Sequence, residues 1–449
     1  MRGWIFPCIG KYGMVVSMKL YPYFFASRGA LVLAGIVFCG LNAGAQGWPE
    51  FRGPEGRGLA EKGAKLPLNW SETSNVSWKT AIPHVGWSTP VALDGQLWLS
   101  SATEDGHDFY AYCVDAETGK MLFEKHLFHC DEPEVLGNSV NCYASPSAAL
   151  EPGRVYMHFG SYGTACLDTA TAKVLWKRDD MPCRHYRGPG SSAILHEDLL
   201  ILTFDGVDQQ YITALDKKTG KTVWRTERTT EWTDWDENGK PKRDGDFRKA
   251  FATPIIVKAA GKEQLLCPAS SCVFAYDPRT GKELWKVPHS GHSASVSPVY
   301  GKGLVLAATG AGTSEILGIR PDGNGDVSGS HVAWRFAGKD VPTTPSPLVV
   351  DDLFFMVSNR GTLTCLEAET GKSVWRERAG GNYIASPIHC GDRIYFFSNN
   401  GKTTVVRAGR VFEQLAENQL DDGFMASPVA LGDSLILRTK THLYRIEER

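Results

Sequence analysis

Apolar and polar residues alternate in short runs along most of the chain, and turn residues separate the runs. RVYMHF (154–159) and RIYFF (393–397) are two examples. Alternation with a period of two predicts half-buried β-strands, because successive side chains of a strand point to opposite faces of its sheet. Helical periodicity is nearly absent. The pattern therefore predicts an all-β protein built from many short strands.

The strands belong to a unit that repeats eight times. One half of the unit is an apolar-flanked step from Ser or Thr to Pro or Ser. This step occurs at Thr89-Pro90, Ser145-Pro146, Ser191-Ser192, Thr253-Pro254, Ser297-Pro298, Ser346-Pro347, Ser386-Pro387 and Ser427-Pro428. The other half is a strand, a turn and a strand with Trp, as in ALDKKTGKTVWR (214–225) and CLEAETGKSVWR (365–376). In the turn, Asp accepts hydrogen bonds from local amides and Gly supplies a positive φ.

Successive steps lie 40–62 residues apart. Short strands in a unit of this length, repeated eight times, are typical of β-propeller blades. The last unit ends at residues 443–446 without a Trp strand, whereas an unpaired Trp strand, NVSWKTAI (75–82), precedes the first step. We expect this strand to complete blade eight and to close the ring, which removes two exposed sheet edges. The Trp position of the unit is then assigned to Trp78, Phe123, Trp176, Trp224, Trp285, Trp334, Trp375 and Phe412. The sequence thus predicts one eight-bladed propeller over residues 75–449, preceded by an N-terminal extension over residues 46–74.

The N-terminus has the pattern of an export signal. LVLAGIVFC (31–39) is a short apolar run that follows Arg28, and Ala43-Gly44-Ala45 is a small-residue cleavage pattern. We expect a signal peptide over residues 1–45, with Met14 or Met18 as alternative starts. An uncleaved anchor would need about 20 apolar residues, and a lipid on Cys39 would follow the bulky Phe38. The expected product is an exported, periplasmic or envelope-associated protein without a transmembrane span.

The charge balance argues against nucleic acid as a partner, and the cysteine count bears on disulfide formation. The chain has 48 Lys and Arg against 50 Asp and Glu, so it lacks the basic footprint of a nucleic-acid-binding protein. Removal of the signal leaves nine of the 11 Cys, an odd number. Three of them, Cys113, Cys166 and Cys365, share one repeat position and are expected to be small buried strand residues. Cys130 with Cys142 and Cys267 with Cys272 are the candidate disulfide pairs.

The Asp-x-x-Thr-Gly-Lys-x-x-x-Trp unit resembles the pyrroloquinoline-quinone (PQQ) repeat. That repeat builds eight-bladed quinoprotein dehydrogenases and the propeller subunit of the outer-membrane barrel-assembly machinery, and the resemblance covers residues 75–446. WPEFRGPEGRG (48–58) and ENQLDDGFMASP (417–428) are similar to segments of exported PQQ-like propellers of planctomycete and verrucomicrobial type. The resemblance implies the fold.

The redox activity does not follow from the resemblance. Quinoprotein dehydrogenases typically carry adjacent cysteines over the quinone, and many carry a Cys-x-x-Cys-His haem site, but the chain has neither motif. The Glu, Asn and Asp that hold their calcium cannot be identified by a motif. PQQ and calcium are therefore the cofactors that the resemblance would bring, and the sequence assigns neither.

Candidate ligand residues lie in the connections between blades, which are expected to meet at one mouth of the propeller. Cationic and His residues in several connections favour an anionic or polar ligand, whereas a ring of ordinary solvated loops is the alternative. The candidates are His84, Trp87, Asn141, Tyr143, Arg184, His185, Arg187, Lys249, His292, Asn382 and Asp422. No catalytic residue is assigned.

Weaker metal patterns occur elsewhere. TDWDENG (233–239) resembles the first half of an EF-hand loop, PDGNGDVSG (321–329) offers alternate oxygen ligands, and HLFHCDE (126–132) brings two His and a Cys together. Each lacks part of its ligand set, so we expect turns and hairpins rather than metal sites.

Two functions of different classes remain after the sequence analysis. The first is a non-catalytic exported propeller that binds a protein or polymer of the cell envelope, with the polar mouth as a ligand site. The second is a PQQ-dependent dehydrogenase that oxidises an alcohol or a sugar, with cations in the mouth polarising the quinone.

Overall fold

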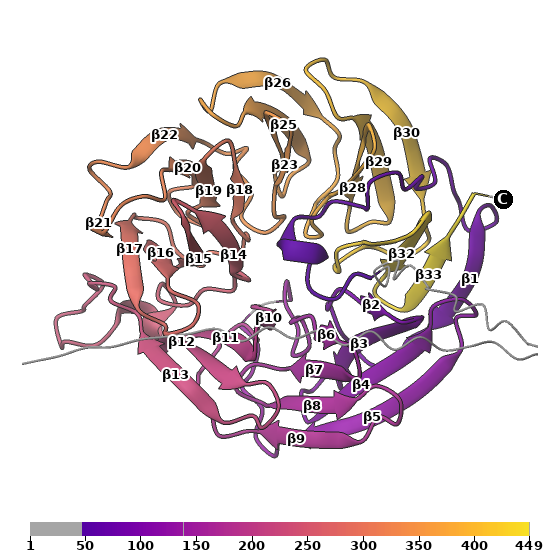
Figure 1. Ribbon diagram of the computed structural model, residues 1–449, viewed down its shortest axis with the longest axis horizontal. Coiled ribbons are helices and arrows are strands. Elements are labelled where there is room, and N and C mark those ends of the chain that lie inside the picture. Colours follow the sequence, from indigo (N-terminus) through magenta and orange to yellow (C-terminus); the bar gives the residue numbers. More distant parts are fainter. Residues whose placement is uncertain (1–46, 138, 449) are drawn as a thin grey trace, which may run out of the picture. The chain divides into compact units, whose positions relative to one another are not determined.

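The computed structural model describes residues 47–137 and 139–448. Eight antiparallel sheets surround a common axis, as the repeat predicts (Figure 1). These residues contain no α-helix and only two 3-10 turns, η1 (Pro54–Gly56) and η2 (Lys242–Gly245). Within the same ranges, no helix is long and apolar enough to cross a membrane. The expected signal peptide, residues 1–45, lies outside the described residues.

The first four blades follow one another in chain order, and each runs from its inner to its outer strand. Blade 1 contains β2 (Val91–Leu93), β3 (Gln96–Ala102), β4 (Asp108–Asp115) and β5 (Met121–His129). Blade 2 contains β6 (Ala149–Glu151), β7 (Arg154–His158), β8 (Thr164–Asp168) and β9 (Val174–Arg178). Blade 3 contains β10 (Ile194–His196), β11 (Leu199–Asp205), β12 (Gln210–Asp216) and β13 (Thr222–Glu227). Blade 4 contains β14 (Ile255–Ala259), β15 (Lys262–Ala269), β16 (Cys272–Tyr276) and β17 (Glu283–Pro288).

The remaining blades repeat this order. Blade 5 contains β18 (Val299–Gly301), β19 (Leu304–Ala308), β20 (Glu315–Ile319) and β22 (Val332–Ala337). Blade 6 contains β23 (Leu348–Val350), β24 (Leu353–Val357), β25 (Thr362–Glu367) and β26 (Ser373–Arg378). Blade 7 contains β27 (Ile388–Cys390), β28 (Arg393–Phe397), β29 (Lys402–Arg407) and β30 (Gln414–Gln419). Blade 8 contains β31 (Val429–Leu431), β32 (Ser434–Arg438), β33 (His442–Ile446) and β1 (Val76–Ala81).

Both ends of the chain build blade 8, which confirms the predicted closure. β1 pairs antiparallel with β33, and Trp78 lies opposite Arg445 while Ala81 lies opposite His442. Because the N-terminal strand supplies the outer edge of the last blade, the ring has no unpaired junction between its first and last repeats.

The repeated turn has the conformation that its sequence predicts. In blade 1, Asp115 Oδ1 accepts bonds from the backbone N–H groups of Glu117 and Thr118 at 3.1 and 2.7 Å, and Gly119 has φ +71°. The glycine is required for a second reason, since the indole of the preceding blade lies against it. A Cβ built on Gly119 would lie 2.6 Å from Cδ2 of Trp78. The same contact joins Trp176 to Gly220, Trp224 to Gly281 and Trp334 to Gly371. At these four junctions, the Trp of one blade therefore packs on the turn glycine of the next blade.

One assignment of the Trp position is wrong. In blades 1, 2 and 6 this residue faces a buried Cys just before a β-bulge, as Trp375 faces Cys365. The equivalent pair in blade 7 is Val405 with Ala416, so Ala416 takes the position instead of Phe412. Phe412 lies before β30, and its ring packs edge-on against Trp375 at 5.3 Å. The two residues pack in different clusters, Phe412 with Trp375 and Ala416 with the cluster of Tyr444.

The cysteines confirm one expectation and contradict another. Cys113, Cys166 and Cys365 share a strand position and are fully buried. Cys130, Cys142, Cys267 and Cys272 are all free, so neither candidate disulfide forms. Cys267 instead accepts a bond from the buried Arg228 at 3.0 Å between donor and acceptor.

The segment PDGNGDVSG (321–329) replaces the usual turn of blade 5. Its residues form β21 (Gly325–Asp326), which pairs in parallel with β17 of blade 4 at Trp285. Val327 is buried beneath it, and Asp326 Oδ1 accepts a bond from Ser328 N. This oxygen-rich loop thus covers the outer edge of the neighbouring blade.

The N-terminal segment before β1 lies against the inner strands. Trp48 forms a bridge with Ala92 of blade 1, and Leu59 forms one with His389 of blade 7. Between them, η1 lies in the middle of the ring of sheets (Figure 1). The buried Arg52 donates hydrogen bonds to the carbonyl groups of Pro347 and Arg57. Residues 48–59 therefore fill one end of the space along the axis. The residues that follow them lie against blades 7 and 8, where the ring of Trp70 stacks on Tyr395 with centroids 6.3 Å apart.

Candidate functional site

A ring of hydroxyl groups surrounds the axis where the inner strands begin. Each blade has one Ser or Thr two residues before its inner strand, and its oxygen accepts the N–H of the equivalent residue in the preceding blade. Seven of the eight bonds are present, with N···O distances of 2.9–3.2 Å. The members are Thr89, Ser147, Ser192, Thr253, Ser297, Ser346, Ser386 and Ser427. Ser297 Oγ is buried without a hydrogen-bond partner among the described residues, so the ring is open between Thr253 and Ser297.

The ring corrects the repeat register in two blades. Blade 2 uses Ser147 rather than Ser145, because only Ser147 lies two residues before β6. Blade 3 uses the second residue of the Ser191-Ser192 pair. The Ser145-Pro146 dipeptide imitates the other steps in sequence, but the position of the strand decides which hydroxyl faces the axis.

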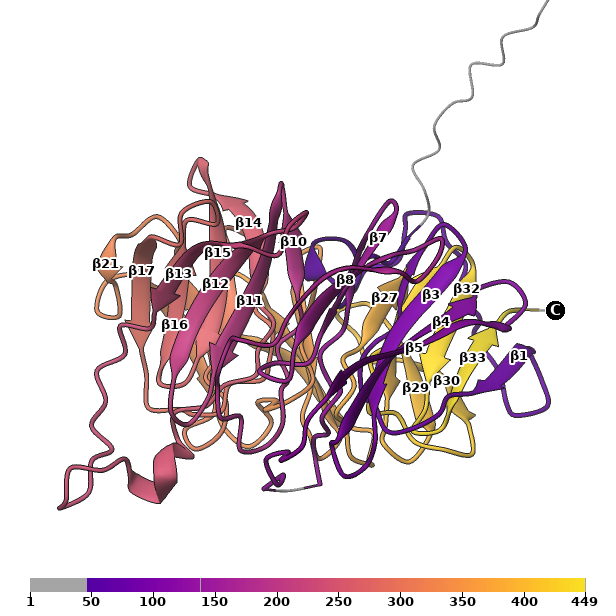
Figure 2. The ribbon, with the colours of Figure 1, turned by 90° about the horizontal axis from the view of Figure 1, so that it is seen from below.

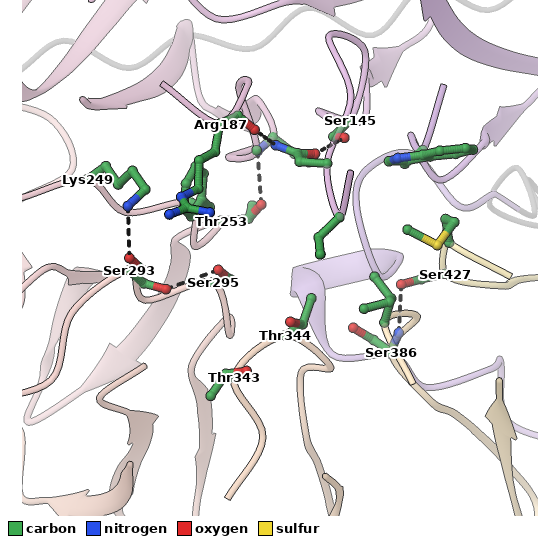
Figure 3. A pocket seen from close by; sticks show the side chains of 18 of the residues that line it. Ser145, Arg187, Lys249, Thr253, Ser293, Ser295, Thr343, Thr344, Ser386 and Ser427 are labelled. Carbon is green, nitrogen blue, oxygen red and sulfur yellow. Dashed lines mark hydrogen bonds between the residues drawn. The ribbon is translucent and has the colours of Figure 1, made fainter. Parts of the chain in front are cut away.

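The hydroxyl ring forms the wall of a pocket of about 390 Å³ at one end of the axis (Figure 3). All eight connections between blades contribute to it, as expected from the fold. Each of the eight connections supplies at least one lining residue. Starting with the connection from blade 8 to blade 1 and following the chain, these residues are Trp87, Asn141, Arg187, Lys249, His292, Thr343, Ile384 and Met425. Phe51 of the N-terminal segment also lines a second cavity among the inner strands, so it separates the pocket from that cavity.

The charged groups of the pocket lie on blades 3 to 5, a set we call the charged arc. It consists of Arg187, Asp246, Lys249 and His292. Arg187 donates from Nε and Nη2 to the two oxygens of Asp246 at 3.3 and 3.2 Å, and Lys249 donates to Asp246 Oδ1. Lys249 also reaches Ser293 Oγ at 3.3 Å, while Ser295 Oγ donates to the carbonyl of Ser293 at 3.2 Å (Figure 3).

Burial and neighbouring charges together set the protonation of these groups. Burial would raise the pKa of Asp246, but the bonds from Lys249 and Arg187 outweigh it and hold the pKa below its ordinary value. Burial lowers the pKa of Lys249, and Asp246 offsets only part of this effect. Burial also lowers the pKa of His292, and the charge of Lys249 lowers it further. The arc therefore holds two cations and one anion beside a histidine that favours its neutral form.

The opposite side of the pocket is apolar. Ile384, Met425 and Trp87, from the connections of blades 6 to 8 and back to blade 1, form what we call the apolar arc. Trp87 Nε1 is buried and has no acceptor among the described residues. The pocket thus has a charged side and a less polar side, and hydroxyls of the ring line both.

Five of the eleven predicted site residues line this pocket, namely Trp87, Asn141, Arg187, Lys249 and His292. The other six lie outside it. His84 stacks on Tyr110 with ring centroids 4.6 Å apart, and Tyr143 donates to the carbonyl of Glu134 at 2.9 Å. Arg184 is exposed and lies 3.4 Å from the carboxylate of Glu134. Asp422 accepts a bond from Thr441 at 2.7 Å, Asn382 accepts bonds from Ser398 and Asn399 through its carbonyl, and His185 is buried.

Some pocket residues were missed. Asp246 stands in the charged run that precedes Lys249, and no spacing in that run distinguishes a pocket carboxylate from a turn residue. Phe51 comes from a segment that the repeat pattern does not cover. The hydroxyl ring had a signal, namely a Ser or Thr two residues before each inner strand, but its use requires the strand boundaries.

His185 makes stability depend on pH. Its Nε2 accepts the N–H of Ser161 at 3.0 Å, and burial lowers the pKa of the ring to about 4. Below pH 6.5 the unfolded chain takes up a proton that the folded chain excludes, so stability falls as the pH falls toward 4. We expect His185→Gln, which keeps an acceptor, to reduce the loss between pH 6.5 and 5 by about 2 kcal/mol in urea unfolding. A loss between pH 6.5 and 5 in His185→Gln that equals the loss of the wild type would contradict the assignment.

The predicted metal patterns are occupied by other contacts. Asp234 binds Arg248 at 2.7 Å, and Asp108 Oδ1 lies 2.8 Å from nitrogens of both His126 and His129. Among the described residues, one group has metal-ligand spacing: His196, Glu197 and Glu263. Arg279 already binds both of its carboxylates, at 2.6 and 2.7 Å.

The pocket does not fit a calcium–quinone pair. Within the described ranges, Asp246 is the only carboxylate that lines it, and two cations already hold that group. The amide of Asn141 is also engaged, since Nδ2 donates to the carbonyl groups of Arg187 and Pro189 and Oδ1 accepts from Ser145. Calcium sites in proteins are built on carboxylate oxygens, and the one carboxylate of this lining is paired with two cations.

Comparison with known proteins places the chain among PQQ-like propellers. The family model described as outer membrane protein assembly factor BamB matches residues 68–267 and 326–447. No curated protein matches the chain.

Solved structures agree on the fold. A europium-containing methanol dehydrogenase has a TM-score of 0.65 at 11% identity, over 89% of this chain and 90% of that one. The quinohemoprotein alcohol dehydrogenase from Comamonas testosteroni has a TM-score of 0.63 at 12% identity, over 89% and 80%. BamB from Moraxella catarrhalis has a TM-score of 0.57 at 12% identity, over 83% and 97%.

Proposed function

The chain belongs to the family described as outer membrane protein assembly factor BamB, and from this premise we propose that it is an exported, non-catalytic binding or scaffold protein of the cell envelope. Its rim binds a protein or polymer partner, and its mouth pocket is a ligand site. Export rests on the signal pattern of residues 1–45. N-terminal sequencing of the protein from an envelope fraction should begin at Gln46.

The observation that carries this proposal is the state of Asp246. Arg187 and Lys249 both bind it, so the pocket offers no free carboxylate as a metal ligand or as a general base. Many metal-dependent and acid–base sites use such a group. The absence of adjacent cysteines and of a Cys-x-x-Cys-His haem motif points the same way.

The pocket side of the propeller also offers apolar anchors for a partner. Val135 and Trp235 are 83% and 47% exposed, and both lie in connections between blades on that side. The connection that holds Trp235 contains η2, which projects beyond the sheets (Figure 2). Exposed aromatic residues are frequent energetic centres of protein interfaces.

We expect the double variant Val135→Ser with Trp235→Ser to lose at least tenfold in recovery of its envelope partner, measured by crosslinking in cells and affinity purification. Val411→Ser is the matched control, because Val411 is 78% exposed but lies beside the blade 7 turn. Equal recovery with all three proteins would contradict a partner site on this side.

A PQQ-dependent dehydrogenase for alcohols or sugars is the second candidate. The two cations beside the axis favour it, since the cofactor is an anionic quinone. Titration of the calcium-loaded protein with PQQ, followed by absorbance and calorimetry, separates the candidates. We expect no saturable binding up to about 100 μM. Micromolar binding that is lost in Arg187→Ala would favour the dehydrogenase.

A further inference from the structure

We propose that the mouth pocket is a receptor for an amphiphilic carboxylate, whose anionic head lies at the charged arc and whose apolar body lies at the apolar arc. The inference rests on the proposed function, since it names the ligand of the same pocket. It follows from the balance of hydrogen-bond donors and acceptors, the net charge and the two-sided polarity of the lining.

Unsatisfied donors dominate the pocket wall. Thr89, Ser147, Ser192, Thr253, Ser386 and Ser427 line the pocket, and each oxygen already accepts a backbone N–H. None of these six hydroxyls donates its own proton to another described residue. Trp87 Nε1–H is buried and equally free. A ligand that matches this wall must bring acceptors.

The carboxylate and the side-chain amide oxygen of the lining are already in use. Asp246 binds two cations, and Asn141 Oδ1 accepts from Ser145. Ser293 Oγ accepts from Lys249 and lies 3.1 Å from Nδ1 of His292. A neutral sugar would find only hydroxyl oxygens and a ring nitrogen of His292 for its protons, and it would bring no charge to match the two cations. The ligand is therefore rich in acceptors and poor in donors.

The charge of the pocket selects an anion. Arg187 and Lys249 outnumber Asp246, and Arg187 Nη1 makes no hydrogen bond to a described residue. Arg243, whose guanidinium lies 5.1 Å from the ring centroid of Phe247, adds a third positive charge near His292. A carboxylate near Arg187 would gain a charge-assisted bond without displacing Asp246.

The apolar arc makes the ligand amphiphilic. Trp87, Ile384 and Met425 come from the connections opposite the charged arc, and Phe51 closes the inner end. A free inorganic anion would leave these surfaces wet. A cavity of about 390 Å³ lies within the size range of small-molecule sites. An aromatic or branched body attached to one carboxylate fills both halves.

The test compares sodium 4-phenylbutyrate with its neutral amide, 4-phenylbutyramide, by calorimetry and by ligand-observed NMR on the full mature protein. We expect saturable binding of the acid and at least tenfold weaker binding of the amide. Arg187→Gln should lower the affinity for the acid about tenfold. Trp87→Phe removes only the indole N–H and part of the ring, and it should lower this affinity severalfold. Circular dichroism and thermal unfolding of each variant verify the fold, and Trp87→Phe tests the site if Arg187→Gln is unstable.

Arg184→Gln is the matched control. Arg184 lies on the same connection as Arg187, but it is 60% exposed and faces Glu134 outside the pocket. Its variant should bind the acid like the wild type. Equal loss in both arginine variants would overturn the proposal, as would equal affinity for acid and amide, or no saturation below about 10 mM.

A second pair of probes distinguishes the source of the carboxylate. N-acetyl-Gly-Phe with a free C-terminus represents a polypeptide end, and its C-terminal amide is the control. Tighter binding of the peptide acid than of phenylbutyrate supports a protein C-terminus as the natural ligand, and the reverse order supports a small organic acid. Either order requires the free carboxylate. Partner recovery by the rim variants is measured separately, so failure of this proposal and failure of the scaffold function can be told apart.

Discussion

Replacing Asp205 with alanine is expected to lower the free energy of unfolding by about 3–5 kcal/mol. Asp205 ends β11 of blade 3, and the Arg228 guanidinium binds it in bidentate fashion at 2.9 and 2.8 Å. The Arg228 and Asp205 side chains are only 1% and 5% exposed. Arg228 also donates to Tyr276 and Cys267 of blade 4, so the pair joins two blades. Without Asp205 a buried guanidinium has no counter-charge.

Equilibrium urea unfolding followed by circular dichroism measures this loss. Glu227→Ala is the control, because the exposed Glu227–Arg225 pair should contribute less than about 1 kcal/mol. A double variant, Asp205→Leu with Arg228→Met, should recover much of the stability, since it removes the charge together with its partner. A loss in Asp205→Ala as small as in Glu227→Ala would show that water reaches the pair.

Replacing Trp285 with alanine is expected to lower the free energy of unfolding by about 3–5 kcal/mol. Trp285 is the fully buried member of the Trp positions, because β21 covers its outer edge. Its Nε1 donates to Gln264 Oε1 at 2.7 Å, and Gln264 in turn donates to the carbonyl of Pro321 at 2.9 Å. The substitution therefore leaves a cavity and also releases the anchor of the segment that covers blade 4.

Trp176→Ala is the matched comparison for Trp285→Ala. Trp176 occupies the same repeat position, but it is only partly buried and no fifth strand covers it. We expect Trp176→Ala to lower the free energy of unfolding about half as much as Trp285→Ala does. The same urea experiment compares the two variants. Equal losses would mean that β21 does not contribute to the packing of Trp285.

The repeat allowed the fold to be predicted in detail. Strand alternation, the Asp-to-Gly turn and the Trp that follows it are local features that recur, so the count of blades and the closing strand 75–82 could be deduced without any long-range information. The prediction failed where two residues were locally equivalent. The pattern selected Phe412 where Ala416 holds the position, and Ser145 where Ser147 does, because only strand pairing decides which residue faces the neighbouring blade or the axis.

The candidate site was harder to predict. Arg184 and Arg187 are three residues apart and chemically alike, yet Arg184 faces outward to Glu134 and Arg187 faces Asp246, which is 59 residues away in the chain. Phe51 reaches the pocket from a segment outside the repeats. Which side chains converge depends on the path of each connection, and each connection has its own length and its own contacts.

The sequence by itself determined the all-β propeller, its eight blades, their Asp-to-Gly turns and the strand that closes the ring, because each can be read from the repeated local pattern. Only the tertiary structure decided that the N-terminal segment fills one end of the axis, that Asp246 is bound by two cations, and that the charged and apolar arcs lie on opposite sides of one pocket. These features arise from single residues in eight different connections, and folding alone brings those residues together.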